Sequence, residues 1–103
     1  MSKKRTLVEL WDYGIKRWKL QRRGERDTSF INDKGHCCAL GLLACAFRRC
    51  LLQHEDAIID AASAAVDDID NFSRIIEAFN GDHFTRAQMR RLFATIDEER
   101  TAQ

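Results

Sequence analysis

The segment from His36 to Gln53 constrains the fold of this chain more than any other. It is apolar nearly all round, and its uninterrupted apolar run from Cys37 to Phe47 is about 11 residues long. A helix of this pattern must be buried on most of its sides. Because roughly 18 consecutive apolar residues are needed to span a bilayer, the run is too short for a membrane helix. We therefore expect a central helix over 36–53 in a soluble protein, with the other elements packed around it.

The length of the chain favours a single domain, 1–103. Its 103 residues suit one hydrophobic core, since a second would be too small to stand alone. With 45% hydrophobic and 32% charged residues, the composition is that of a chain that folds.

Apolar side chains recur at helical spacing in four further segments. One stripe comprises Leu7, Trp11, Ile15 and Trp18, and another comprises Ile58, Ala61, Ala62, Ala65, Val66 and Ile69. Thr85 to Gln88 has the pattern of a capping box, which begins a helix. Residues 20–35, with two glycines and many charges, are expected to form a long loop with room for a short extended piece. The predicted fold is all-α, a compact bundle with helices at 4–18, 36–53, 55–69, 72–80 and 85–99 around a buried, Cys-rich central helix.

Three short motifs carry a family resemblance. They are Trp18 to Gln21, Gly35 to Leu43, and Ile75 to Asn80, with Thr85 following. The chain resembles an uncharacterised family of small bacterial and phage proteins that has a central Cys-Ala-Leu-Gly-Ala-Leu helix and a late Trp-Asn-Asp turn. Here Phe79 and Gly81 stand where that turn has Trp and Asp. The resemblance implies an almost entirely helical fold and brings no activity with it.

The first residues are basic, but no uninterrupted apolar run of a signal peptide follows them. We therefore expect a cytoplasmic protein with reduced thiols. The four cysteines, Cys37, Cys38, Cys45 and Cys50, all fall within the predicted central helix, where neighbouring side chains mostly diverge, so no disulfide is expected.

The first candidate site is a cysteine at the start of that helix. A helix N-terminus lowers the pKa of a thiol and offers N–H groups to an oxyanion. Cys37 or Cys38 would then be the nucleophile of a cysteine-dependent hydrolase, as in papain-like enzymes. His83 or His36 would be the base, Asn80 or Asp82 the orienting group, and Gln21 the oxyanion donor. Against this, cysteine is among the residues most often buried simply for packing, and we expect no enzyme.

A metal site is the second candidate. Cys50 and His54 lie four residues apart and would share a helical face, with Cys45 or His83 completing a tetrahedron. The chain has no Cys-x-x-Cys motif, so we expect neither a metal nor a cofactor.

Charge is sorted along the chain. Residues 1–26 carry nine Lys and Arg against three acids, whereas residues 51–103 carry five Arg against eleven acids. Phosphates could be bound by the basic residues Lys16, Arg17, Lys19, Arg22, Arg23 and Arg26. The last two predicted helices also have the length of a helix-turn-helix, whose second helix would carry Arg86, Gln88, Arg90 and Arg91. However, Trp11 and Trp18 lie on an apolar face, which favours packing over base stacking.

The acidic residues form the last candidate. Glu55, Asp56, Asp60, Asp67, Asp68 and Asp70 occur over sixteen positions without a Lys or Arg. This density is compatible with a solvated face, or with a docking surface for a partner protein with a basic surface. We expect a non-enzymatic protein-interaction module, with nucleic-acid binding and hydrolysis as alternatives. On size and resemblance, a phage or mobile-element accessory protein that inhibits a host defence protein would fit.

Overall fold

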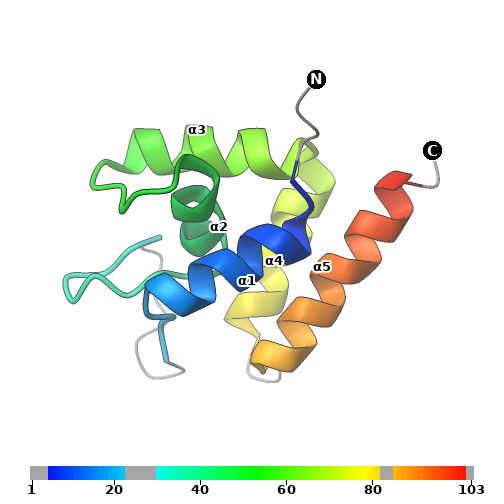
Figure 1. Ribbon diagram of the computed structural model, residues 1–103, viewed down its shortest axis with the longest axis horizontal. Coiled ribbons are helices and arrows are strands. Elements are labelled where there is room, and N and C mark those ends of the chain that lie inside the picture. Colours follow the sequence, from blue (N-terminus) through cyan, green and yellow to red (C-terminus); the bar gives the residue numbers. More distant parts are fainter. Residues whose placement is uncertain (1–4, 23–29, 82–84, 102–103) are drawn as a thin grey trace.

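The computed structural model describes residues 5–22, 30–81 and 85–101, and over these residues the fold is all-α, as predicted. Isolated bridges join Leu20 and Ile31 to Cys37, but no strand forms in the described part of the chain. None of its helices is long and apolar enough to cross a membrane. The five helices are α1 (Leu7–Arg17), α2 (Ala39–Arg48), α3 (Glu55–Val66), α4 (Ile69–Asn80) and α5 (Arg86–Thr101) (Figure 1).

Helix α2 stands at the centre of the molecule. Figure 1 shows α3 running across its end and α1 crossing in front of it, while α4 and α5 close the other side. Every residue of α2 from Ala39 to Ala46 is buried, which confirms the predicted central helix. Three alanines on the facing side of α3 permit a close approach of the two helices: Ala61, Ala62 and Ala65.

The central helix is shorter than the predicted range of 36–53. Cys38 is its N-cap, in extended conformation. Before it, Cys37 is held between two extended segments, donating its N–H to Lys19 O at 2.8 Å and accepting from Gln21 N at 2.8 Å. Cys38 N–H in turn donates to Phe30 O at 2.8 Å. The apolar pattern predicted helix over residues 36–38 as well, and this was wrong. Extended residues that are buried on both sides are as apolar as the residues of a buried helix, so the pattern does not distinguish the two.

At its other end α2 stops at Arg49, which has left-handed backbone angles, φ 60° and ψ 32°. The N–H groups of Arg49 and Cys50 bond back to Ala46 O and Cys45 O, closing the helix in a Schellman motif. Residues 49–54 are therefore a connection, and the predicted helix over them was wrong.

Helix α1 begins with two sets of caps. The Thr6 hydroxyl accepts from Glu9 N at 3.1 Å. The Asp97 carboxylate, far along the chain on α5, accepts from Leu7 N at 2.9 Å and from Val8 N at 3.0 Å. A carboxylate at a helix N-terminus satisfies free N–H groups and interacts favourably with the helix dipole. Asp97 thus ties the start of α1 to α5.

The buried side of α1 comprises Leu7, Leu10, Trp11 and Gly14. Trp11 packs against Phe93 of α5, with ring centroids 5.2 Å apart. The predicted stripe is confirmed at its first two positions, whereas Ile15 and Trp18 are only half-buried. Gly14 faces α2 so closely that a Cβ there would lie 2.9 Å from Leu42 Cγ.

Helices α3 and α4 meet at a sharp corner rather than across the predicted gap of 70–71. Asp67 takes a left-handed conformation, φ 61°, and ends α3. The Asp68 carboxylate then caps α4, accepting from Asp70 N at 2.8 Å and Asn71 N at 3.2 Å. The two predicted boundaries at Ile69 and Phe72 were therefore wrong by about three residues, because an aspartate cap was read as part of a helix.

Helix α5 begins as predicted. Thr85 N donates to Gln88 Oε1 at 2.8 Å, and Gln88 N donates to the Thr85 hydroxyl at 3.2 Å, the reciprocal pattern of a capping box. The helix buries Met89, Phe93 and Ile96.

Candidate functional site

The predicted nucleophile Cys37 is a core residue. Its side chain is fully buried and donates a hydrogen bond to the buried thiol of Cys45. That hydrogen bond, together with burial, raises the pKa of the Cys37 thiol. The same bond lowers the pKa of Cys45, which also accepts from Leu52 N at 3.5 Å, while burial opposes that shift. Both thiols are buried and therefore closed to a substrate.

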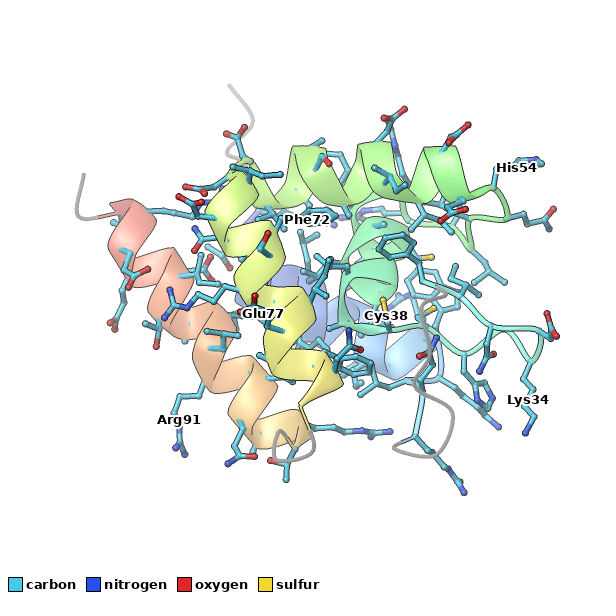
Figure 2. The ribbon with its side chains drawn as sticks, turned by 180° about the vertical axis from the view of Figure 1, so that it is seen from behind. Lys34, Cys38, His54, Phe72, Glu77 and Arg91 are labelled. Atoms are coloured by element: carbon cyan, nitrogen blue, oxygen red, sulfur yellow. The ribbon has the colours of Figure 1, made fainter. Side chains whose placement is uncertain are left out.

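Cys38 lies at a helix N-terminus, as expected, but its thiol is the N-terminal cap of that helix. It accepts from Gly41 N at 3.3 Å, as an N-cap does. Burial raises the pKa of this thiol, and the N–H groups of Gly41 and Leu40 offset that effect only in part. Cys38 is half-buried and lies beside α4 at the start of α2 in Figure 2. The raised pKa and the use of the thiol as a cap both weaken the case for a nucleophile.

The other members of the hydrolase hypothesis do not assemble around these thiols. Gln21 is buried and donates to His36 O at 3.1 Å, so its amide fixes the loop beside Cys37. Asn80 is the exposed last residue of α4 and makes no described hydrogen bond to Cys37 or Cys38. His83 and Asp82 lie outside the described residues.

The structure does not bring the proposed metal ligands together either. Cys50 and His54 lie in the connection between α2 and α3, not on one helical face. Both are exposed, and His54 points outward from the molecule in Figure 2. Within residues 5–22, 30–81 and 85–101, no three His, Cys, Asp or Glu side chains gather as metal ligands would.

Two of the four residues that the helix-turn-helix hypothesis places against nucleic acid are engaged in contacts within the protein. Arg90 pairs with Asp12 of α1 through two hydrogen bonds, each 2.9 Å long. This hydrogen-bonded ion pair lowers the pKa of Asp12 and raises that of Arg90. Gln88 is engaged in the capping box. Arg86 and Arg91 remain exposed on α5.

The predicted basic set is partly described. Lys16, Arg17, Lys19 and Arg22 are all exposed, whereas Arg23 and Arg26 lie outside the described residues. Trp11 is only 2% exposed and therefore unable to stack on a base. Trp18 is half-buried, with its ring 6.1 Å from that of Tyr13.

Tyr13 is the centre of an arginine cluster that the sequence did not indicate. The guanidinium carbons of Arg17, Arg49 and Arg5 lie 3.8, 5.2 and 5.9 Å from its ring centroid. The three arginines are far apart in sequence, and Arg49 enters the cluster only because α2 ends beside α1.

The predicted acidic residues occupy the outer side of α3 and its corner with α4. Glu55, Asp56, Asp60 and Asp70 are exposed, and oxygen-tipped side chains project from the side of α3 that faces away from the other helices (Figure 2). Asp68, however, is the cap of α4. Its substitution would therefore change folding as well as charge.

Exposed isoleucines lie among these carboxylates. Ile59 of α3 is 36% exposed, and Ile69, in the first turn of α4, is 77% exposed. The prediction that Ile69 extends the buried stripe of α3 was wrong, since α3 ends three residues earlier. Recognition of Asp68 as an N-cap would have placed Ile69 correctly. We call the surface formed by the following residues the acidic face: Glu55, Asp56, Ile59, Asp60, Asp68, Ile69 and Asp70.

A recess of about 560 Å³ adjoins one end of the acidic face. The apolar part of its lining comprises Ile31, Leu52 and Ile58. The exposed carboxylates of Asp33 and Glu55 form part of its polar lining. Leu51, also in its lining, is 43% exposed. The arrangement suits a side chain with an apolar stem and a cationic end.

No family model, curated protein or solved structure matches this chain.

Proposed function

We propose that this protein is a non-enzymatic interaction module that binds a basic segment of a partner protein on the acidic face. The observation that carries the proposal is Ile69, a large apolar side chain that is 77% exposed between Asp68 and Asp70. Ile59 adds a second exposed isoleucine to the acidic face, and exposed apolar patches rimmed by polar residues mark interaction sites.

The two kinds of residue have separate roles in such a complex. Full burial of an isoleucine against a partner contributes about 1.5 to 3 kcal/mol. The exposed carboxylates of Asp56 and Asp60 speed encounter with a basic partner and disfavour acidic ones. Neither forms an ion pair with a described residue, so their charges are available to a partner.

The buried cysteines support the non-enzymatic part of this proposal. The Cys37 and Cys45 thiols are hydrogen-bonded to each other, and the Cys38 thiol caps the N-terminus of α2. That the partner is a host defence protein, inhibited by a phage or mobile-element protein, rests on the family resemblance and on the small size of the chain.

Site-specific photocrosslinking tests the proposal. A photoreactive amino acid at Ile69, introduced in cells where the protein is native, should capture a discrete polypeptide that mass spectrometry identifies. The same group at the exposed Arg91 of α5, labelled in Figure 2, is the matched control and should not capture it.

Charge reversal tests the electrostatic contribution. The pair Asp56→Lys and Asp60→Lys should abolish the crosslink without changing the circular dichroism spectrum, since both residues are exposed and neither caps a helix. Glu98→Lys, at an exposed position on α5, should leave the crosslink intact. Equal yields from Ile69 and Arg91, or a yield unchanged by the reversed pair, would refute the proposal.

A further inference from the structure

The arginine cluster around Tyr13 is a second charged surface, distinct from the acidic face. Arg17 lies against the ring at 3.8 Å, with Arg49 at 5.2 Å and Arg5 at 5.9 Å. Arg17 and Arg49 are exposed, and Arg5 and Tyr13 are half-buried. Three structural elements thus bring three cations to one aromatic ring.

The ring holds these cations without neutralising them. A cation–π contact contributes about 0.5 to 1 kcal/mol at an exposed site, and the charge remains. Among the described residues no carboxylate forms an ion pair with Arg5, Arg17 or Arg49; the described ion pairs are Arg74 with Glu99 and Arg90 with Asp12. Three positive charges around one ring, none of them neutralised by a described carboxylate, favour a bound anion.

We infer that this cluster binds the phosphodiester backbone of a nucleic acid. A guanidinium group presents a planar fork of N–H donors that matches a phosphate. A nucleic-acid strand carries one charge about every 3.4 Å along its axis, which supplies several anions to three neighbouring arginines.

The geometry also sets the kind of recognition. Arg17 covers a face of Tyr13, and Trp11 is buried, so these rings are not open to stacking with bases. Contacts to phosphates carry no sequence information. Binding is therefore independent of sequence and falls steeply with salt. The inference does not depend on the acidic face, which repels the same ligand.

Fluorescence anisotropy with a labelled single-stranded oligonucleotide of mixed sequence, and with its duplex, measures this binding. Each phosphate neutralised contributes a slope of about −0.7 for single strands or −0.9 for duplex in log K against log salt. Arg17→Gln should weaken binding about tenfold, equivalent to 1.4 kcal/mol, and should make the slope less steep by about one such unit.

Two variants separate the geometry of the cluster from net charge. Tyr13→Leu keeps every charge but removes the ring, and should also weaken binding, whereas Tyr13→Phe keeps the ring and should bind as the original protein does. Arg91→Gln removes a positive charge from the exposed side of α5 and should leave both affinity and slope unchanged. Circular dichroism and thermal unfolding establish that each variant is folded.

Three results would overturn the inference. They are absence of oligonucleotide binding at 50 mM salt, equal slopes for Arg17→Gln and Arg91→Gln, and binding of poly-glutamate as tight as that of the oligonucleotide. The last result would assign the cluster to an acidic protein. The crosslink from Ile69 is measured separately, so either proposal can fail alone.

Discussion

Gly41→Ala is the substitution whose effect the structure defines most clearly. Gly41 lies in the first turn of α2, where the extended segment at Phe30 crosses the helix. A Cβ at this position would overlap the Phe30 carbonyl oxygen and lie 3.1 Å from the Phe30 carbonyl carbon. Both are backbone atoms, so no side-chain rotation relieves the overlap. The Phe30 carbonyl also accepts from Cys38 N at 2.8 Å, and moving it breaks that hydrogen bond.

The magnitude follows from three contributions. Overpacking costs about 1 to 3 kcal/mol, and loss of the hydrogen bond costs about 0.5 to 1.5 kcal/mol. The better helix propensity of alanine returns up to about 1 kcal/mol. We therefore expect Gly41→Ala to lower the free energy of unfolding by about 1 to 3 kcal/mol, although alanine is the better helix former.

Urea unfolding followed by circular dichroism measures this loss. Because the denaturant slope of a small domain is about 1 to 3 kcal/mol per molar urea, the midpoint should fall by roughly 1 M. Gly81→Ala is the matched control, since its Cβ would lie 3.4 Å from Glu77 O at a φ of −71° that alanine adopts readily. A Gly41→Ala variant as stable as Gly81→Ala would show that Phe30 does not cross α2 at this point.

Four further predictions follow from individual contacts. Asp97→Ala should lower the free energy of unfolding by about 1 to 3 kcal/mol in urea titrations, because two N–H groups at the start of α1 lose their acceptor. Asp68→Ala should lower it by about 1 kcal/mol, because α4 loses its N-cap. Asp12→Asn should lower the urea midpoint at neutral pH. The pKa of Asp12 is lowered in the folded protein, so the stabilisation by its pair with Arg90 is fully present above the usual pKa of 3.8 and is lost as the pH falls through the lower pKa of the folded state. The difference in urea midpoint between the variant and the original protein should therefore disappear in acid. With a thiol reagent under native conditions, Cys50 should react first, and Cys37 should react only on unfolding.

Each of these predictions has a control or a contradicting result. Asp70→Ala, in the first turn of α4 and exposed but not its cap, should change stability by less than about 0.5 kcal/mol. Glu98→Ala serves the same purpose beside Asp97. An Asp12→Asn difference that persists in acid would contradict the pairing with Arg90. Rapid modification of three or more thiols in the native protein would contradict the burial of Cys37 and Cys45.

The predicted helices were confirmed where the pattern was long and one-sided. The stripe of α3 and the capping box of α5 specify their elements locally, because helical periodicity and capping depend only on residues a few positions apart. The boundaries failed where another interaction decided them. Cys37 is extended because Lys19 and Gln21 pair with it from another segment, and the apolar pattern does not distinguish a buried extended residue from a buried helical one.

The candidate sites divide in the same way. The acidic residues were recognisable in the sequence because they are close together in it, but the exposure of Ile69 depended on the cap at Asp68. Of the arginine cluster, only Arg17 was among the predicted basic residues. Arg5 and Arg49 are 44 positions apart, and only the packing of α1 beside the end of α2 brings them to the same ring.

The sequence by itself determined that this protein is helical, that the apolar segment within 36–53 is its centre, and where its negative charge lies. These properties follow from local periodicity and composition. The tertiary structure decided which thiols are buried, that Asp97 caps a helix about 90 residues away, and which arginines share Tyr13. Those contacts join segments remote in sequence, and their positions are fixed by how the helices pack.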